Sequence, residues 1–439
     1  MSDILIVGFP KSGNTWLSRL LSDALDWTVT GINDAVPLAA QPKAHTDNVI
    51  RQLHLSPKSL DGHPAVADQY SFNVNAYTDQ KIVHIIRDPR DVAVSIHHYW
   101  GREDFKETLR DVLGRGAHPL WGCSWAQYVT AWRTINIPVI ETRYECLQED
   151  TALELARLIT QMDLRACGPL NAVIAQNEIE TKRQWLKEHG ENLPHGLGAQ
   201  LTNLRAGRVG DWRNWFDFSD ALWAAQYLND QLLALGYESD QDWYLRYQVP
   251  DSFVAEIAAR FCQQFDDPLH NPRLVKSLGL YQLAGMVHAG SIIELGTYHG
   301  NGAVSLARHS HGRTVYTIDD YADYTGWMGE HYGAPEREIM QRNLHDLNLP
   351  IEWIEAESQQ AAQTWDKPIG LLYWDIGGAD HLHADFEAWQ SHIMRGGLFV
   401  IHDTLERNFK SDELIEGAIQ SGQWAAGPQL PMLYTLVKQ

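Results

Sequence analysis

One stretch near the N-terminus, residues 4–20 (ILIVGFPKSGNTWLSRL), constrains the fold of this chain more than any other. The short apolar run at 4–7 predicts a buried parallel strand, and residues 15–21 predict the start of a helix. The turn between them holds Gly8 and Gly13, whose backbones can approach a ligand closely. Because the N–H groups at a helix N-terminus and the helix dipole point at the same place, this unit predicts an anion-binding site.

The spacing of this turn almost matches the nucleotide-binding P-loop, G-x-x-x-x-G-K-[ST], but the lysine is displaced. Asn14 stands where the P-loop lysine belongs, and Lys11 lies inside the turn instead. The displaced lysine and the tryptophan that follows at Trp16 argue against a merely structural turn. The missing lysine also weakens the hypothesis of a P-loop kinase, which is kept as an alternative.

Length and composition narrow the class of protein. The 439 residues predict two domains, and 44% hydrophobic with 21% charged residues is an ordinary globular balance. A net charge of −21 argues against a nucleic-acid partner and against an anionic membrane surface, since both need basic faces. The four cysteines show no CxxC pairing, which indicates a reducing compartment. With the first strand expected at residue 4 and no apolar run as long as a membrane span, we expect a cytoplasmic protein.

A second strand–turn–helix unit follows at residues 81–100. The apolar run KIVHII at 81–86 predicts a buried strand, which leads directly into Arg87 and then into a helix-like segment at 92–100. This order places Arg87, and Arg90 as a further candidate, at a helix N-terminus, with Ser95 inside the helix. We therefore expect a second phosphate-binding site at the same kind of sheet edge.

Three motifs resemble, in order and spacing, three signatures of the cytosolic sulfotransferase family: PKSGNTW at 10–16, IIRDPRDVAVS at 85–95 and RAGRVGDWRNWF at 205–216. The resemblance covers residues 1 to about 240. It implies transfer of a sulfuryl group from 3′-phosphoadenosine 5′-phosphosulfate (PAPS) to a hydroxyl or amine. By analogy with phosphoryl transfer, such a reaction has a loose in-line transition state, so positioning and charge stabilisation at the leaving oxygen matter most.

The resemblance assigns roles to individual residues. Lys11 would contact the 5′-phosphosulfate and stabilise charge on the leaving phosphate. The other residues expected to bind the donor are Ser12, Gly13, Asn14 and Thr15 in the loop, Trp16 and Tyr144 beside the adenine, and Arg87, Ser95, Arg205 and Gly207 around the 3′-phosphate. The chain departs from the family at Ala206, where a lysine is usual, and Arg208 and Arg183 are candidate replacements for that cation. A milder departure is the asparagine at position 14, where a threonine is usual.

The general base that takes the acceptor proton is less clearly marked. The family uses a histidine in K-T-H at the end of a strand, and His54, in VIRQLHL at 49–55, resembles it best. His45, in PKAH, and Asp68, in AVADQY, stay as alternatives.

The second half opens a new pattern at SIIELGTYHGNGAVSLARH (291–309), again a strand, a Gly-rich turn and a helix. Further strands are expected at 314–318, 351–355, 369–374 and 397–401, and each ends in polar residues. Because parallel strands bring their C-terminal ends to one edge, these residues predict a single ligand edge. The predicted fold class is thus α/β, with two parallel-sheet, three-layer α/β/α domains, P-loop-like at 1–243 and Rossmann-like at 253–439, and a linker at 244–252.

The second half resembles the class I S-adenosylmethionine (SAM)-dependent methyltransferases, in particular the branch with small-molecule O-methyltransferases. The resemblance rests on ELGTYHGNG, TIDDY and WDIGGADHLHADFEAW followed by GGLFVIHDT. It implies that SAM is bound by Glu294, Gly296, Gly300 and Gly302 along its methionine and ribose, by Asp319 at the ribose hydroxyls, and by Glu357 and Ser358 near the adenine. Some members hold Mg²⁺ with carboxylates at the last two strand ends, which here are Asp375 and Asp403. His381 and His402 are candidates for a base that would deprotonate an acceptor hydroxyl.

The leading hypothesis is therefore a bifunctional enzyme, a PAPS-dependent sulfotransferase fused to a SAM-dependent O-methyltransferase, with small-molecule acceptors. The alternative keeps the sulfotransferase active and makes the second half a non-catalytic module for binding or for forming a homo-oligomer.

Overall fold

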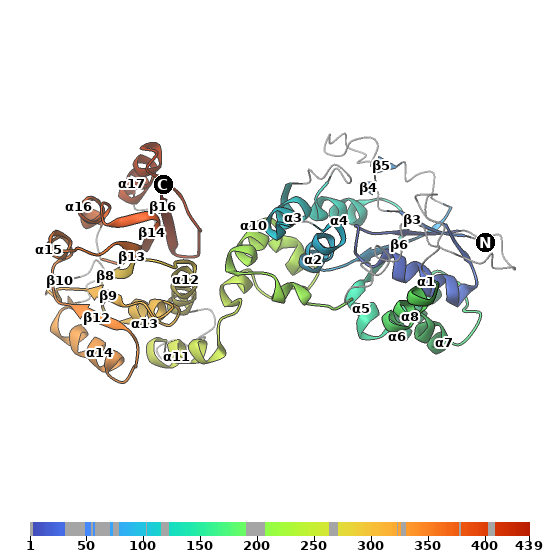
Figure 1. Ribbon diagram of the computed structural model, residues 1–439, viewed down its shortest axis with the longest axis horizontal. Helices are drawn as coiled ribbons and strands as arrows, with labels where there is room; N and C mark the ends of the chain where they lie inside the picture. The colour runs from blue at the N-terminus through green and yellow to red at the C-terminus, as the bar shows by residue number, and fades with distance from the viewer. Residues whose placement is uncertain are drawn as a thin grey trace. The chain divides into compact units, whose positions relative to one another are not determined.

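The computed structural model describes residues 3–30, 49–53, 56–57, 71–72, 79–101, 103–115, 123–189, 207–262, 271–322, 324–325, 331–376, 379–402 and 409–439. The chain forms two compact units, Met1–Gln241 and Asp242–Gln439, and each is built around its own sheet (Figure 1). No helix in the described ranges is both long and apolar enough to cross a membrane.

The main sheet of the first unit has, among the described residues, five strands in the order β2-β3-β1-β6-β7, and all neighbours pair in parallel. These strands are β1 (Ile4–Val7), β2 (Thr28–Thr30), β3 (Val49–Leu53), β6 (Lys81–Ile86) and β7 (Val139–Arg143). β1 and β6 lie in the middle and are buried along almost their whole length, as expected for parallel strands that are covered on both faces. A separate parallel pair joins β4 (Ser56–Pro57) to β5 (Ser71–Phe72).

Helices cover both faces of this sheet (Figure 1). The helical segments are α1 (Asn14–Leu25), α2 (Pro89–Trp100), α3 (Phe105–Arg110), the π-helical η3 (Asp111–Arg115), α4 (Trp125–Thr134), α5 (Tyr144–Glu149), α6 (Thr151–Gln161), α7 (Leu170–Asn177), α8 (Ile179–His189), the 3₁₀ turn η5 (Asp211–Asn214) and α10 (Phe218–Ala234). On one face, α1, α6 and α7 pack against Ile4 and Ile85 of the central strands. On the other face, α4 places Tyr128 and Trp132 against the buried ring of His84.

The second unit contains a larger sheet, with seven strands in the described residues and the order β12-β9-β8-β13-β14-β16-β15. The strands are β8 (Ser291–Leu295), β9 (Val315–Ile318), β12 (Ile351–Ile354), β13 (Ile369–Trp374), β14 (Ile393–His402), β15 (Trp424–Ala426) and β16 (Leu433–Lys438). The first five strands in the order are parallel, and β16 runs antiparallel to both of its neighbours. Parallel pairing therefore dominates, and the C-terminal ends of β8, β9, β12, β13 and β14 meet at one edge.

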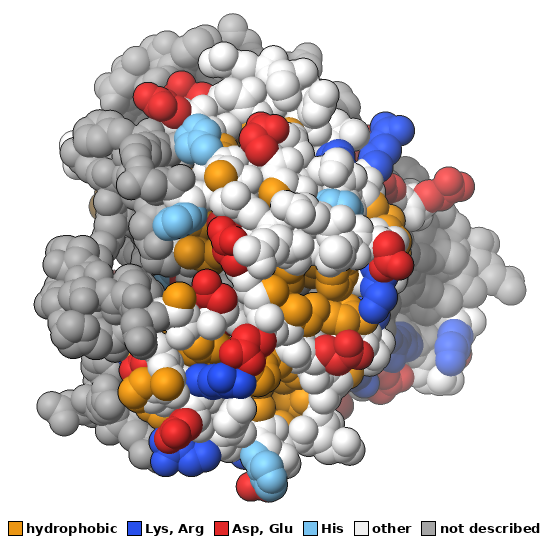
Figure 2. All heavy atoms as spheres, turned by 90° about the vertical axis from the view of Figure 1, so that its left-hand side faces the viewer, with side chains coloured by type: hydrophobic (Ala, Val, Ile, Leu, Met, Phe, Trp, Pro, Cys, Tyr) orange, Lys and Arg blue, Asp and Glu red, His pale blue; other side chains and the backbone are white. Residues whose placement is uncertain are grey.

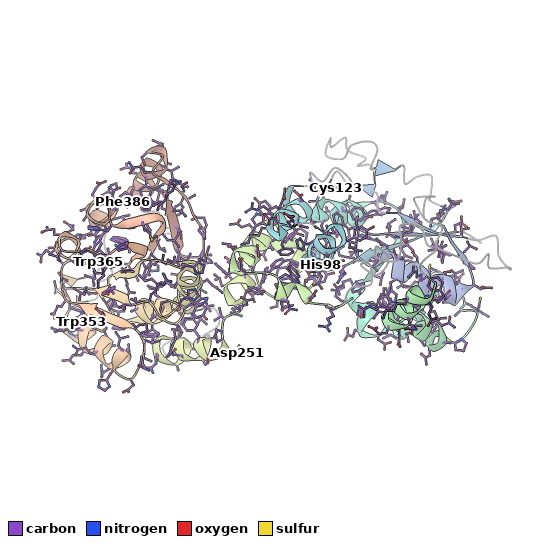
Figure 3. All side chains as sticks on the ribbon, viewed as in Figure 1. His98, Cys123, Asp251, Trp353, Trp365 and Phe386 are labelled. Atoms are coloured by element: carbon purple, nitrogen blue, oxygen red, sulfur yellow. The ribbon has the colours of Figure 1, made fainter. Side chains whose placement is uncertain are left out.

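Helices flank this sheet on both faces, which completes a second α/β/α arrangement (Figure 1). The remaining elements are η6 (Trp243–Arg246), α11 (Asp251–Phe261), α12 (Pro272–Met286), α13 (Asn301–Ala307), the short pair β10 (Tyr324–Thr325) and β11 (His331–Tyr332), α14 (Ala334–His345), α15 (Ser358–Gln363), α16 (Ala379–Trp389) and α17 (Phe409–Gln420). The side chains of α15, α16 and α17 form one core with the sheet; Phe386 belongs to this core and Trp365 packs against it (Figure 3). Both units thus have the predicted α/β fold class.

Residues 244–252, where the sequence predicts a linker, begin inside the second unit. Trp243, Tyr244 and Leu245 are buried in η6. The side-chain amide of Gln282, on α12, donates hydrogen bonds to the carbonyls of Leu245 (3.0 Å) and Tyr247 (2.8 Å). These contacts attach the start of the segment to α12.

Trp389 belongs to the core of the second unit, and its removal should lower the stability of that unit. It is fully buried, and its Nε1 donates a hydrogen bond to the hydroxyl of Ser358 (3.0 Å). We expect Trp389→Ala to lower the free energy of unfolding of this unit by about 3–5 kcal/mol, because it leaves a large cavity. Chemical denaturation followed by circular dichroism measures the change. Ile419→Ala, at a side chain that is 38% exposed on α17, is the control and should cost less than about 1 kcal/mol. Equal costs for the two variants would contradict the expectation.

Candidate active sites

The turn between β1 and α1 is shaped by its own side chains. Asn14 is buried, and its amide nitrogen donates to the carbonyls of Gly8 (3.0 Å) and Phe9 (3.3 Å). A Cβ on Gly8 would lie 2.1 Å from the Asn14 side-chain oxygen, so only glycine fits there. The asparagine that replaces the P-loop lysine therefore braces the loop from inside. Its amide nitrogen is used within the loop.

Lys11 has a left-handed backbone conformation (φ 68°) in this turn. Its ammonium nitrogen lies 4.2 Å from the ring centroid of Tyr99, which is 42% exposed on α2. Burial, together with the charge of Arg87, lowers the pKa of Lys11 to about 8. The next residue, Ser12, is buried, and its hydroxyl has no hydrogen-bond partner among the described residues. Thr15 is exposed in the first turn of α1.

Arg87 connects the motifs at the end of β6. Its guanidinium donates to the carbonyl of Lys11 (3.2 Å) and to the carbonyl of Arg208 (3.1 Å), and it lies 4.3 Å from the ring centroid of Tyr144. Its Nε is buried and has no partner in the described part of the chain. Ser95 follows on α2 at helical spacing from Asp91, so it lies on the same side of the helix as this cluster.

Asp91 attaches the third motif to this cluster. One carboxylate oxygen accepts from the backbone N–H of Gly210 (2.8 Å) and the other from the N–H of Trp212 (2.9 Å). Tyr144 adds a hydrogen bond from its hydroxyl to the carbonyl of Gly207 (2.8 Å). With the bond from Arg87, these contacts hold residues 207–212, the 207–212 segment, against both earlier motifs. The Gly-Asp-Trp sequence thus supplies two backbone donors to a buried carboxylate.

Arg90, the second candidate cation, has a different role. It is 1% exposed, pairs with Asp88 (2.7 Å) and with Glu238, and lies 3.9 Å from the ring centroid of Trp212. With both carboxylates engaged around it, this guanidinium stabilises the fold and is not available to a phosphate. Arg183, a candidate replacement for the missing lysine, pairs with Glu180 on α8.

Aromatic side chains also line this site. Trp16 meets Tyr144 edge to face, with ring centroids 5.6 Å apart. Gly13 (φ 101°) lies directly against Tyr144, because a Cβ there would come within 2.5 Å of the ring. Ile179, at the start of α8, borders Gly207, since a Cβ on that glycine would lie 3.5 Å from its Cδ1. Ile179 was not predictable from the sequence, because it lies in a polar, Gly-rich stretch that favours a loop.

Several predicted residues lie outside the described residues. These are the candidate bases His54, His45 and Asp68, then Arg205 and Ala206 of the third motif, and Asp403 of the second half.

In the second unit, Glu294 is the last residue but one of β8 and is buried inside the protein. It is 1% exposed, and its carboxylate accepts from the hydroxyl of Thr317 (2.6 Å). A Cβ on Gly302 would lie 1.9 Å from its other oxygen, which explains the glycine. Burial raises the pKa of Glu294 to about 8; the nearby Asp375 adds to this rise and the bond from Thr317 opposes it.

Asp319, at the end of β9, is tied to the Gly-rich turn. Its carboxylate accepts from the backbone N–H groups of Thr297 (2.8 Å), Tyr298 (3.2 Å) and Tyr321 (2.9 Å). Gly296 (φ 91°) lets this turn approach the end of β13, since a Cβ there would lie 2.4 Å from the Asp375 carbonyl oxygen. The structure thus brings together the ends of β8, β9 and β13, as the sequence predicts.

The other predicted residues of this half are placed less uniformly. Gly300 (φ 86°) is the N-cap of α13 and faces Leu344 of α14. Glu357 is the N-cap of α15, but the hydroxyl of Ser358 points into the core, where it accepts from Trp389. His381 is exposed on α16.

Asp375 is the centre of a polar cluster of which the sequence indicated Asp375 and His402 but not Lys276 or Tyr373. Its carboxylate receives the ammonium of Lys276 (3.0 Å), the hydroxyl of Tyr373 (2.7 Å) and Nδ1 of His402 (2.7 Å). Burial alone would raise its pKa, but Lys276 and His402 hold the pKa of Asp375 well below its usual range. Lys276 comes from α12, before the Gly-rich motif, so no local pattern connects it to Asp375. The described residues contain no group of three or more His, Cys, Asp and Glu side chains placed to bind a metal ion.

A groove of about 450 Å³ lies elsewhere on this unit, between α14 and the edge strand β12. Its lining includes Met340, Leu344, Ile351 and Trp353 and no residue of the Gly-rich turn, so it is not the predicted SAM site. Figure 2 shows the unit from the side on which α14 lies, where hydrophobic side chains are exposed among charged ones.

Comparison with known proteins matches a different family to each half of the chain. A family model described as a sulfotransferase domain matches residues 1–235, and one described as a methyltransferase domain matches residues 293–404. The chain is 25% identical over 236 residues to sulfotransferase 1E1 of Mus musculus, which covers 49% of this chain and 78% of that protein. Mouse sulfotransferase SULT7A1 complexed with PAP is 19% identical, with a TM-score of 0.41, and covers 53% of this chain and 84% of that chain. The SAH-bound methyltransferase PaMTH1 of Podospora anserina is 12% identical, with a TM-score of 0.34, and covers 45% of this chain and 93% of that chain.

The two family models identify the chain as a transferase with two domains. The first is a sulfotransferase domain and the second a methyltransferase-like domain. Because the sulfotransferase match spans more than half of the chain, this protein belongs to the sulfotransferase family.

The contacts of Asp91 predict that it controls the order of the 207–212 segment. Asp91→Asn keeps one acceptor oxygen but turns an NH₂ group toward the second backbone N–H, at a cost of about 1–3 kcal/mol. We expect hydrogen exchange at Gly210 and Trp212 to become at least about ten-fold faster. Asp104→Asn is the matched control, because Asp104 also accepts two backbone N–H groups, at the exposed start of α3. Unchanged exchange at 207–212 in Asp91→Asn would refute the role.

The buried Glu294 predicts a pH dependence of stability. Its folded-state pKa of about 8 lies above its ordinary value of 4.5, so the folded protein holds a proton that the unfolded chain releases. Stability from this group is full below the ordinary pKa and is lost as the pH rises toward 8, by about 1.4 kcal/mol per pH unit. Relative to wild type, Glu294→Gln should therefore gain up to about 3 kcal/mol between about pH 5.5 and 8. Denaturation at several pH values measures this gain. The control, Glu387→Gln, changes an exposed carboxylate in the same unit and should track wild type.

Proposed function

We propose that the first unit transfers a sulfuryl group from PAPS to a hydroxyl or amine of a small molecule. The observation that carries the proposal is the convergence of three distant motifs on Arg87, which bonds to the Lys11 loop and to the 207–212 segment and lies over Tyr144. PAPS carries a 3′-phosphate and a 5′-phosphosulfate on one ribose, so it needs cationic groups at both positions and an aromatic surface for the adenine. Nothing in the arrangement favours ATP, because Asn14 takes the P-loop lysine position and is used inside the loop.

In this proposal the described side chains position the donor and stabilise charge. Lys11 would face the bridging oxygen of the phosphosulfate and offset the charge that develops there as the sulfuryl group leaves. Arg87 would bind the 3′-phosphate, and its buried, unpartnered Nε is a donor suited to an oxyanion. Trp16, Tyr144 and Ile179 would hold the adenine. His54 stays the preferred base, with His45 and Asp68 as alternatives.

We infer that the second unit binds SAM and methylates an oxygen of a small molecule. Glu294, Asp319 and the glycines between β8 and α13 meet at one sheet edge, which supports a site for the methionine and ribose of SAM. The competing proposal is a module that binds or oligomerises without catalysis. Calorimetry with S-adenosylhomocysteine is the first test, since no binding at millimolar ligand would favour the module without catalysis; where it binds, methyl transfer to an acceptor decides between the two.

The decisive experiment incubates the full chain with PAPS, SAM and a panel of phenols, alcohols and amines, followed by mass spectrometry. Sulfation adds SO₃ to the acceptor, a gain of about 80 Da. Methylation adds CH₂, a gain of about 14 Da. Sulfation without methylation, together with no S-adenosylhomocysteine binding, would favour the non-catalytic second half. In a separate incubation with ATP and Mg²⁺ in place of PAPS, hydrolysis of ATP, combined with no sulfation from PAPS, would revive the kinase hypothesis.

Lys11 and Arg87 should separate chemistry from donor binding. We expect Lys11→Met to lower kcat by at least about 100-fold, because it removes charge stabilisation in the transition state. Its affinity for 3′-phosphoadenosine 5′-phosphate should change by less than about ten-fold, whereas Arg87→Met should weaken that affinity by about 10–100-fold through the loss of charged hydrogen bonds. Kinetics and calorimetry measure the two effects. Arg110→Met, on the exposed end of α3, is the control. Normal turnover by Lys11→Met would overturn the mechanism.

A further inference from the structure

The cluster at Asp375 already contains a positively charged group, the ammonium of Lys276, bound to the carboxylate. Within the described residues, its carboxylate is reached by three donors from different elements: Lys276 of α12, Tyr373 of β13 and His402 of β14. Lys276 is only 13% exposed at its side chain, and Tyr373 is fully buried. These donors are therefore fixed by packing and are not mobile surface groups.

We propose that the ligand edge of the second unit functions without a divalent metal ion, because Lys276 takes the cation position that Asp375 would otherwise offer to Mg²⁺. The inference rests on the proposed methyltransferase function, and it is an alternative to the expectation that Asp375 and Asp403 hold Mg²⁺; Asp403 lies outside the described residues. It assigns Lys276 as the residue that presents positive charge at this edge.

The geometry at each carboxylate oxygen supports the proposal. Oδ2 already accepts from both the Lys276 ammonium and the Tyr373 hydroxyl, and Oδ1 accepts from the His402 ring. Mg²⁺ requires a near-octahedral shell of oxygen atoms at about 2.0–2.1 Å, which leaves no room for an ammonium on the same oxygen. A divalent ion would also have to approach a fixed positive charge at close range in a partly buried site.

The neighbouring carboxylates at this edge are engaged as well. Asp319 accepts three backbone N–H groups, and Glu294 accepts from Thr317 inside the protein. Burial favours the neutral form of Glu294, so it adds little negative charge for a cation. In the described part of the edge, Asp375 is therefore the carboxylate with negative charge to offer a metal ion, and Lys276 already occupies it.

Lys276 can supply part of what a metal would supply. An ammonium has three N–H donors, and among the described residues Asp375 is its hydrogen-bond partner. The remaining donors suit an acceptor oxygen that develops negative charge as its proton leaves. The chemical class this fits is a phenol or other acidic hydroxyl, whose anion is stabilised by one fixed positive charge.

Binding of Mn²⁺, measured by the loss of its free electron paramagnetic resonance signal, tests the proposal on the full chain. The comparison uses wild type, Asp375→Asn, Lys276→Met, the double variant, and Lys367→Met as a charge-matched control at an exposed lysine of the same unit. We expect the isotherms of wild type, Asp375→Asn and Lys367→Met to coincide. Lys276→Met should bind Mn²⁺ at least about ten-fold more tightly than wild type, because the substitution removes the fixed positive charge. The double variant should lose this gain.

Two outcomes would overturn the proposal: a wild-type site that disappears in Asp375→Asn, or no gain in a folded Lys276→Met. Where a variant does not fold, as judged by circular dichroism, wild type alone decides. Its thermal midpoint should be the same in 5 mM MgCl₂ and in EDTA at equal ionic strength, and a rise of several degrees with Mg²⁺ would refute the proposal. The metal experiments need no SAM. Failure to bind S-adenosylhomocysteine would thus reject the methyltransferase function separately.

Discussion

The first site depends on the hydrogen bonds that the buried carboxylate of Asp91 accepts. A carboxylate that is removed from water must be surrounded by donors, and here those donors are the backbone N–H groups of Gly210 and Trp212. The requirement brings a segment from more than 100 residues later in the chain to the start of α2. Burial raises the pKa of Asp91, and the neighbouring charge of Arg87 opposes that rise. The same contact therefore sets both the fold of the 207–212 segment and the electrostatics beside Arg87.

The second unit solves a similar problem with charged donors. Asp375 at the end of β13 is satisfied by an ammonium, a phenol and an imidazole, which come from three elements. In both units, one acidic residue at a strand end or a helix start thus gathers the side chains around a ligand edge. The hydrogen-bond donors differ between the two carboxylates: backbone N–H groups bind Asp91, with the Arg87 guanidinium 3.9 Å away, whereas charged and polar side chains bind Asp375.

Local patterns were enough to predict the two α/β folds, whereas the roles of the motif residues follow from the resemblance to two families and stay predictions. The apolar runs at 4–7 and 81–86 became β1 and β6, and the glycines near Glu294 lie at the predicted turn. Roles that depend on distant partners were not predictable in this way. Arg90 looked like a phosphate ligand because of its position at a helix N-terminus, but its pairing with Asp88 and Glu238 is formed only in the folded chain. Lys276 and Ile179 have ordinary local sequences, and only the tertiary structure brings them to a site.

Tyr144 joins four parts of the first site at once. Its ring lies beneath Arg87, meets Trp16 and excludes a side chain at Gly13, while its hydroxyl binds the carbonyl of Gly207. Residues that share one partner in this way are energetically coupled, so the effects of their substitutions do not add. We therefore expect the effect of a substitution at one of these positions to depend on which residues occupy the others. A change at Trp16 or Gly13 alters which residues are tolerated at 207, and the three motifs can diverge only as a set.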